Sequence, residues 1–274
     1  MSRMQQRFAD LSAAGRKALI PYVVAGDPTP AISVPLLHGL VSAGADAIEI
    51  GVPFSDPMSE GPVIQRGHER ALANRIRLRD VLAMVGEFRE GDADTPVLLM
   101  GYANPVEHMG YAAFADAASR VGLDGLLTVD VPPEEVGRVN RELKRVNMDN
   151  IFLISPTTPD SRLHLITDQA SGFIYYVSLK GVTGAGNLDI DAVGDHVSRI
   201  RRCTELPVCV GFGIKDAASA SAVARVADGV VVGSALVSRV ADSLADNGNH
   251  AGAIDAAASL VREIRAGIDT RQGA

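Results

Sequence analysis

The sequence has few cysteines, no basic run and no long apolar run, and each absence argues against a class of protein. Cys203 and Cys209 are the only two cysteines among 274 residues, and their spacing fits neither a metal site nor a disulfide framework. We therefore expect two reduced structural thiols. The net charge of −7, without any basic run, argues against binding to nucleic acid or to an anionic membrane surface. Backbone amides at a helix N-terminus can still bind a small phosphate without a basic patch.

No membrane segment, secretion signal or metal motif is evident in the chain. No apolar run approaches the roughly 18 residues that a membrane span needs. The opening MSRMQQRFADL is not a signal peptide, since Met4, Phe8 and Leu11 recur at helical spacing and predict a short amphipathic helix. The six histidines share no motif with one another or with a cysteine, so none is assigned to a metal or to catalysis. We expect a cytoplasmic protein.

Eight short apolar runs are the main feature of the sequence. They are nearly continuous in apolar residues, which is typical of parallel strands buried on both faces. Segments of helical periodicity lie between them, and eight strand–helix alternations predict an α/β fold, a (β/α)₈ TIM barrel. No linker is visible, so residues 1–274 are expected to form a single domain with the short extra helix at the N-terminus. The runs are 18–26, 46–51, 96–101, 124–130, 151–155, 173–178, 207–213 and 228–235.

A doubly wound open sheet is the alternative fold. Such a sheet normally carries a glycine-rich dinucleotide-binding turn after its first strand, and AGDPTPAIS is not that turn. Two segments are polar and are expected to be solvated: GEFREGDADT at 86–95 and the C-terminal tail IDTRQGA at 268–274.

In a barrel of this kind the active site lies where the strands end, and Glu49 is the most informative residue there. Side chains alternate along a strand, so Ile48 and Ile50 suit the helix layer and Glu49 points into the barrel mouth. Burial of a carboxylate raises its pKa toward the range useful for proton transfer, unless a cation elsewhere in the chain pairs with it. Glu60 follows in the next loop. Together they suggest a two-carboxylate site, which by itself names no reaction.

Glycine turns end the seventh and eighth runs, at 211–213 (GFG) and at Gly233-Ser234. Barrels often bind phosphate between these two loops, because glycine lets a ligand approach the backbone and a helix N-terminus attracts an anion. Ser234 can also cap the helix that follows. The alternative is a pair of ordinary tight turns. The segment 179–187 (LKGVTGAGN) has three glycines and is interpreted either as a mobile lid or as a merely flexible loop.

Seven stretches, in their order and spacing, resemble the tryptophan synthase alpha chain family over nearly the full length. The run GVPFSDP with a glutamate just before it is highly specific. The stretches are PYVVAGDPTP (21–30), IEIGVPFSDPMSEGPVIQ (48–65), LLMGYANPV (98–106), GLDGLLTVDVPPEE (122–135), GFIYYVSLKGVTGAG (172–186), PVCVGFGI (207–214) and DGVVVGSALV (228–237).

The resemblance implies a lyase of the last steps of L-tryptophan biosynthesis. Its reaction would be the retro-aldol cleavage of indole-3-glycerol phosphate to indole and glyceraldehyde 3-phosphate. The indole would pass to a partner, the tryptophan synthase beta chain, in an expected α₂β₂ heterotetramer. The alpha chain would use no metal and no cofactor of its own, and pyridoxal phosphate would be carried only by the beta chain.

The resemblance also implies roles for individual residues. Glu49 matches the catalytic acid/base, which would protonate indole C3 and help take the proton from the glycerol hydroxyl. Glu60 supplies the second carboxylate, and Tyr175 matches a position beside the reacting side chain. The remaining positions are Gly184, Phe212, Gly213, Gly233 and Ser234 for phosphate; Tyr22, Met100 and Leu127 for the indole pocket; Lys180 and Thr183 in the lid; and Pro53, Asp56, Asn104, Pro132 and Glu135 for the beta-chain interface.

The chain departs from the family pattern at two positions. The more familiar residue at 60 is Asp, which accepts the indole N–H and stabilises the positive charge of the indolenine, whereas Glu60 is longer by one C–C bond of roughly 1.5 Å. Because a carboxylate is kept, we predict that its role is kept. Many members carry Arg at 179, where this chain has Leu179, and the neighbouring Lys180 can supply the charge.

Two other functions are weighed against this one. The first is a catalytically weak subunit that mainly binds and activates the beta chain, which the change at Glu60 would allow. The second is another barrel enzyme acting on a phosphorylated substrate, such as the indole-glycerol-phosphate synthase step. That chemistry would need a lysine near a strand end inside the barrel, and none of the eight runs contains a lysine.

Overall fold

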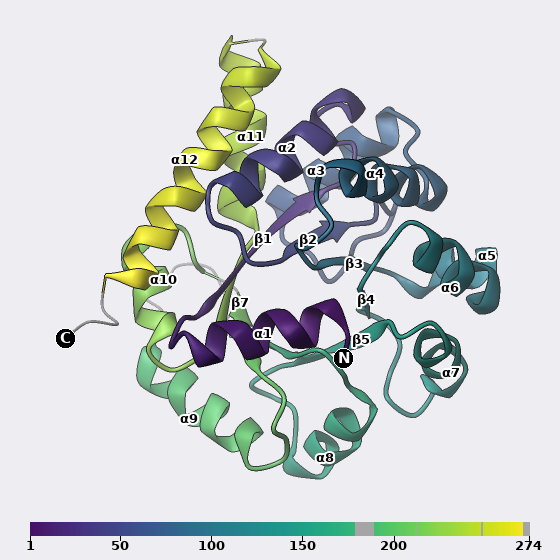
Figure 1. Cartoon of the computed structure of the whole chain (residues 1–274), viewed down its shortest axis with the longest axis vertical. Coiled ribbons are helices and arrows are strands. Elements are labelled where there is room, and N and C mark those ends of the chain that lie inside the picture. Colours follow the sequence, from purple (N-terminus) through teal and green to yellow (C-terminus); the bar gives the residue numbers. More distant parts are fainter. Residues whose placement is uncertain (179–188, 212, 248, 271–274) are drawn as a thin grey trace.

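The structure is a computed structural model that describes residues 1–178, 189–211, 213–247 and 249–270. Within these residues, parallel strands β1 to β8 pair in chain order, and β8 pairs back with β1 to close a barrel. Helices surround the barrel on the outside (Figure 1). The predicted (β/α)₈ barrel is confirmed, and the doubly wound open sheet is wrong. No helix in the described part of the chain has the length and apolar character needed to cross a bilayer.

Each predicted apolar run contains one strand of the barrel or overlaps with it. Six of the strands end earlier than their runs because the chain turns into the βα loops at that point, and β2 and β3 end where their runs do. β5 begins earlier than predicted, because its first two residues are polar and carry no apolar signal. The strands are β1 Ala18–Val24, β2 Ile48–Gly51, β3 Val97–Gly101, β4 Gly125–Thr128, β5 Asp149–Ile154, β6 Ile174–Val177, β7 Val208–Gly211 and β8 Gly229–Val232.

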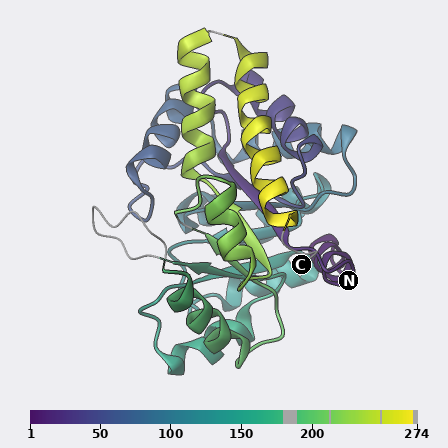
Figure 2. The ribbon, with the colours of Figure 1, turned by 90° about the vertical axis from the view of Figure 1, so that its left-hand side faces the viewer.

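The helices of the outer layer bury apolar residues against the strands or against neighbouring helices. α11 and α12 form an adjacent pair along one side of the molecule and extend past the barrel (Figures 1 and 2). The helices are α1 Arg3–Ala13, α2 Pro30–Ser42, α3 Pro62–Ala73, α4 Leu78–Gly91, α5 Ala103–Met109, α6 Tyr111–Arg120, α7 Gly137–Arg145, α8 Asp160–Gln169, α9 Ile190–Arg201, α10 Ala217–Ala224, α11 Ser234–Asn247 and α12 His250–Asp269.

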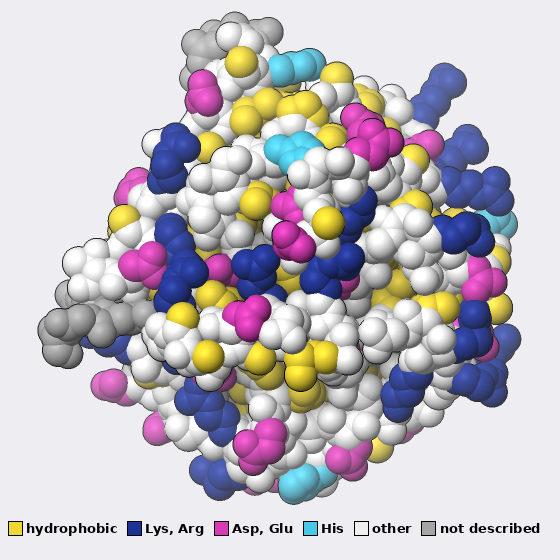
Figure 3. All heavy atoms as spheres, in the orientation of Figure 1, with side chains coloured by type: hydrophobic (Ala, Val, Ile, Leu, Met, Phe, Trp, Pro, Cys, Tyr) yellow, Lys and Arg dark blue, Asp and Glu magenta, His cyan; other side chains and the backbone are white. Residues whose placement is uncertain are grey.

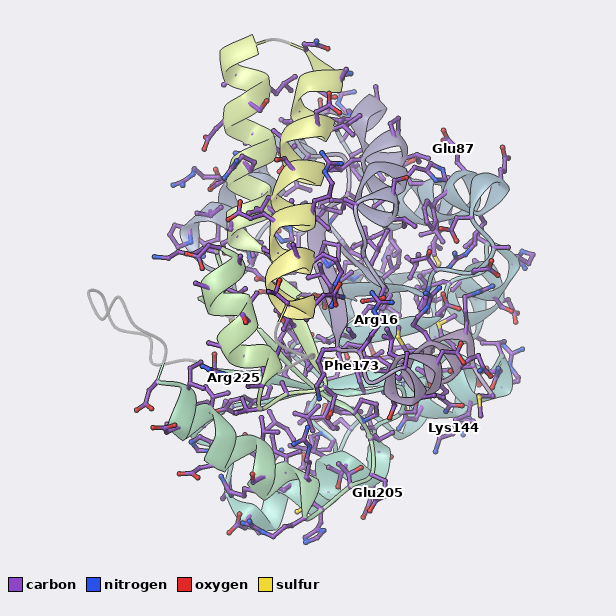
Figure 4. The ribbon with its side chains drawn as sticks, turned by 60° about the vertical axis from the view of Figure 1, so that its left-hand side comes forward. Arg16, Glu87, Lys144, Phe173, Glu205 and Arg225 are labelled. Carbon is purple, nitrogen blue, oxygen red and sulfur yellow. The ribbon has the colours of Figure 1, made fainter. Side chains whose placement is uncertain are left out.

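The predicted N-terminal helix is present as α1 and covers the N-terminal end of the barrel (Figure 1). The Ser2 side chain caps it by accepting a hydrogen bond from the Gln5 N–H, and Met4, Phe8 and Leu11 are buried. The Phe8 ring lies 5.6 Å from the ring of Phe173, which sits next to α1 in Figure 4. The apolar stripe of α1 therefore closes the bottom of the barrel.

The segment 86–95 is largely solvated, as predicted, but not throughout, since Phe88 and Thr95 are buried. α4 continues through most of it, and Phe88 is completely buried. Phe88 lies three residues after the buried Val85 and seven after Val81, so it extends the apolar stripe of the helix. The high charge of the segment hid this single apolar position.

The predicted solvated tail is also shorter than 268–274. α12 runs to Asp269, and Ile268 is buried one turn after Ile264. Residues 271–274 lie outside the described residues.

The strand side chains divide into two apolar layers. The outer layer, between strands and helices, contains Ile48 and Ile50. The inner layer, inside the barrel, contains Leu98, Leu127 and Tyr175. This alternation decides which residues of each strand can reach the interior, where the candidate site lies.

Candidate active site

A cavity of about 580 Å³ opens at the C-terminal end of the barrel. Its walls come from the ends of several strands and from the first turns of α3 and α11. Among the described residues that line it, only Glu60 and Lys215 are charged. The sequence-predicted residues that line the cavity are Tyr22, Glu60, Met100, Tyr175, Gly213, Gly233 and Ser234.

Glu49 lies beside this cavity, inside the barrel. In the strand register it pairs with Tyr22 of β1 and Leu98 of β3, whose side chains also face inward. It is completely buried, and within the described residues neither carboxylate oxygen has a hydrogen-bond partner. No described cation pairs with it, so the alternative of a structural ion pair finds no support there.

The two carboxyl groups have pKa values close to neutral pH. Burial raises the pKa of Glu49 to about 8, and the charge of Glu60 acts in the same direction. Burial raises the pKa of Glu60 to about 7. A carboxyl group in this range can both give and take a proton at neutral pH, which is the requirement for general acid–base catalysis.

The loop after β2 holds Glu60 at the cavity through its main chain. The Glu60 N–H donates to the Pro57 carbonyl at 3.0 Å, and the Gln65 side-chain amide donates to the Glu60 carbonyl at 2.9 Å. The Ser59 N–H donates to the Tyr102 hydroxyl at 3.0 Å. The Glu60 carboxylate itself forms no hydrogen bond with a described residue, so it is free to bind a ligand.

The hydroxyl groups of Tyr22 and Tyr175 each lie over a glycine at the end of a neighbouring strand, on opposite sides of the site. The hydroxyl of Tyr22 lies over Gly51 at the end of β2, and that of Tyr175 lies over Gly211 at the end of β7. A Cβ at either glycine would collide with the hydroxyl, so both strands end in glycine to make room for the rings. Burial, together with the nearby carboxylates, raises the pKa of both tyrosines well above the ordinary value, and both remain hydrogen-bond donors.

The end of the cavity away from Glu60 suits an anion. Gly213 has φ +74°, a conformation that favours glycine, and it leaves the backbone exposed. α11 starts at Ser234, and the first amides of a helix have no acceptor within the helix. Lys215 adds a positive charge at the same end. A phosphate group fits these donors.

Other sequence-predicted residues lie away from the cavity or outside the described residues. Leu127 is fully buried in the inner layer and does not line the cavity. Gly184, Phe212, Lys180 and Thr183, and the lid predicted at 179–187, lie outside the described residues.

The residues predicted for the partner interface lie on three successive βα loops. Asp56, Asn104 and Glu135 are exposed, Pro132 is half-buried and Pro53 is buried. The rings of Phe54 and Tyr102 stack at 4.6 Å, and the Ala103 N–H donates to the Asp130 carboxylate at 2.8 Å. These contacts join the three loops into one rim beside the cavity.

Sequence reasoning missed several residues of the site. Val63 and Ile64 enter the cavity from the first turn of α3, and Lys215 enters from the loop after β7. His68, also on α3, is buried and contacts both the loop after β2 and Tyr22. Lys215 could have been found, because it stands only two residues after the glycine turn. His68 could not, since its helix has no sequence motif that reports which side faces the strands.

Comparisons with known proteins agree with this geometry. The sequence profile described as tryptophan synthase alpha chain matches residues 8–267. The chain is 62% identical over 242 residues to the tryptophan synthase alpha chain of Thioalkalivibrio sulfidiphilus, covering 88% of this chain and 91% of that one. It is 56% identical over 269 residues to that of Thiobacillus denitrificans, covering 98% and 97%.

Solved structures give the same result. The chain superimposes on tryptophan synthase subunit alpha from Legionella pneumophila with a TM-score of 0.92 and 43% identity, covering 98% of this chain and 99% of that one. A chain of tryptophan synthase from M. tuberculosis in an aminoacrylate-bound form gives a TM-score of 0.85 and 34% identity, covering 98% and 100%.

Proposed function

The chain belongs to the tryptophan synthase alpha chain family, and from that premise we propose how its cavity carries out the family reaction. The enzyme is a lyase that cleaves indole-3-glycerol phosphate to indole and glyceraldehyde 3-phosphate. The observation that carries the proposal is the buried carboxyl of Glu49 inside the barrel, which has no hydrogen-bond partner among the described residues.

Glu49 acts as the acid and the base of the retro-aldol step. Its protonated carboxyl gives a proton to indole C3. The ring thereby becomes an indolenine with a positive charge at nitrogen. Its carboxylate then takes the proton of the glycerol hydroxyl next to the ring. The bond between indole C3 and the side chain breaks, its electrons return to the ring, and the hydroxyl carbon becomes the aldehyde. A pKa of about 8 supports both roles near neutral pH.

Glu60 binds the indole N–H and stabilises the positive charge that develops on the ring. Its carboxylate lines the cavity and has no partner among the described residues, which leaves both oxygens for the substrate. Charge stabilised in a water-poor site contributes more to the rate than the same contact in water. Tyr175 lies beside the reacting side chain as a hydrogen-bond donor.

The two charged ends of the cavity orient the substrate. The phosphate lies with Gly213, Gly233, Ser234 and Lys215, and the indole lies toward Glu60, between apolar walls that include Met100. The family pattern adds Gly184 and Phe212 at the phosphate, and Lys180 and Thr183 in a lid over it. No metal or cofactor takes part in this step.

As a member of the tryptophan synthase alpha chain family, the chain is proposed to work with a beta chain. We propose an α₂β₂ heterotetramer in the cytoplasm, with pyridoxal phosphate carried only by the beta chain. The rim formed by the three joined loops supports this contact, because its residues are largely exposed and Met58 at its tip is 84% exposed.

The proposal is tested by adding indole-3-glycerol phosphate to the isolated chain and measuring indole. Glu49→Gln keeps the shape of the side chain but cannot transfer the proton, so indole formation should fall at least about a hundredfold. Substrate binding should remain, because the phosphate and indole contacts lie elsewhere. Near wild-type indole formation by this variant would remove Glu49 from the mechanism. A wild-type chain that forms no indole but activates the beta chain would support the weak-subunit function instead.

A further inference from the structure

We propose that His68 is a positioning residue, which holds the Tyr22 hydroxyl so that its proton is directed at the Glu60 carboxylate. The inference rests on the proposed role of Glu60. It concerns a residue on the outer helix α3 that touches neither substrate nor a reacting atom.

His68 is fixed between the loop after β2 and the first strand. Its side chain is 2% exposed. The Phe54 N–H donates to Nδ1 at 3.1 Å, so Nδ1 must carry a lone pair rather than a proton. The proton of the neutral ring is therefore on Nε2, which lies 3.5 Å from the Tyr22 hydroxyl oxygen. One hydrogen bond thus selects the tautomer that can donate to Tyr22.

The packing of α3 keeps this ring in place. Gly67, next to His68, brings the helix close to the barrel, since a Cβ there would lie 3.0 Å from an Asp27 oxygen. One turn later in α3, Arg70 donates to Asp27 at 2.6 Å. Burial also lowers the pKa of His68 to about 4, so the ring stays neutral at neutral pH.

The Tyr22 hydroxyl has a proton left to donate. It accepts from His68, so its own O–H is not needed in that contact. The hydroxyl lies over Gly51, at the end of the strand that carries Glu49. Tyr22 and Glu60 both line the cavity, and the charge of Glu60 acts on the Tyr22 hydroxyl there, ahead of that of Glu49. The 3.5 Å contact is long, but hydrogen bonds of a catalytic site often shorten when the substrate binds.

A double-mutant cycle tests the proposal. Tyr22→Phe removes the hydroxyl, and His68→Asn keeps an acceptor for the Phe54 N–H but cannot reach Tyr22. Each variant should lower kcat/KM about five- to tenfold, through kcat rather than KM, which is the effect of one hydrogen bond. The double variant should be no slower than either single variant, because both changes remove the same contact.

The matched control is His68→Gln, whose side-chain amide can reach Tyr22 and should recover most of the rate. Its recovery must disappear in the Tyr22→Phe background. Effects that multiply in the double variant, or a wild-type rate for His68→Asn, would overturn the proposal. If His68→Asn lowers both the rate and the thermal stability, with and without Tyr22→Phe, then His68 has a structural role, and that result would also overturn the proposal. The proposed function fails separately, through the Glu49→Gln measurement.

Discussion

The aspartates at the N-terminal end of the barrel and Glu49 at the C-terminal end are carboxyl groups in opposite situations. At the N-terminal end, the buried Asp46 and Asp124 and the half-buried Asp228 accept backbone hydrogen bonds and pair with arginine or lysine. At the C-terminal end, Glu49 is more deeply buried and has no described partner. A buried charge that is fully paired can stabilise a fold, whereas an unpaired one is available for chemistry. Position along the barrel axis alone does not decide the role, because Asp27, after β1 at the C-terminal end, is buried but paired with Arg70. The absence of a described partner is what sets Glu49 apart.

The pairing at the N-terminal end repeats around the barrel. Before β2, β4 and β8, one aspartate donates its N–H to the carbonyl of a residue on the preceding strand and accepts the N–H of that same residue. Before β6 a serine does the same. The pairs are Asp46 with Leu19, Asp124 with Val97, Asp228 with Val208 and Ser171 with Asn150.

Cations complete the network on this face of the molecule. Arg265 donates to Asp46 at 2.9 Å, Arg89 donates to Asp124 at 2.7 Å, and Arg201 donates to Asp228 at 2.7 Å. Positive and negative side chains lie side by side across the same face in Figure 3. No such cation reaches Glu49 among the described residues at the other end.

The largest effect is expected at the paired end. Asp124→Ala leaves Arg89 buried without its carboxylate and the Val97 N–H without its acceptor, so it should lower the free energy of unfolding by about 3–5 kcal/mol. Urea unfolding followed by circular dichroism measures this. The matched control, Glu134→Ala, breaks the exposed pair with Arg162 and should leave stability within experimental scatter. An equal loss of stability in the two variants would contradict a stabilising role for the buried ion pair of Asp124.

A smaller effect, on rate rather than stability, is expected from the unpaired end. Glu60→Ala should lower kcat/KM about 10- to 150-fold, because one charge-assisted hydrogen bond to the substrate contributes roughly 1.5–3 kcal/mol. Glu60→Asp should lose much less, since it keeps the carboxylate. Neither change should lower the unfolding midpoint. An alanine variant with wild-type kinetics would contradict the role of Glu60.

The last test of the comparison uses the dependence of stability on pH. The pKa of Glu49 is about 8 in the folded chain, above its ordinary 4.5, so the folded state holds a proton that the unfolded state releases. Stability should therefore fall as pH rises from about 5 to 8, by at most about 1.4 kcal/mol per pH unit from this group. Glu49→Gln should flatten that slope, as measured by unfolding midpoints across the range. An unchanged slope would mean that Glu49 is already ionised in the folded chain.

Sequence patterns could predict the barrel and the direction of Glu49, because both depend on local alternation of apolar residues. They could not predict the network at the opposite end. Asp46 and Arg265 are 219 residues apart in the chain, and nothing in the local pattern around either one indicates the other. The same limit applies to His68, whose contacts depend on how α3 packs. Ile268 shows a simpler failure, since a polar composition concealed one apolar position at helical spacing.

The position of α1 has a consequence for how the chain is synthesised. Ser2 donates a hydrogen bond to Asp149, which is 147 residues further along, and Arg3 pairs with Asp124, which is 121 residues further along. At roughly 5–20 residues per second, a ribosome needs about 7 to 30 seconds to reach Asp149 after making Ser2. During that time Met4, Phe8 and Leu11 have no barrel to cover. The nascent chain therefore presents this apolar stripe to chaperones, or to other nascent chains, well before the barrel exists.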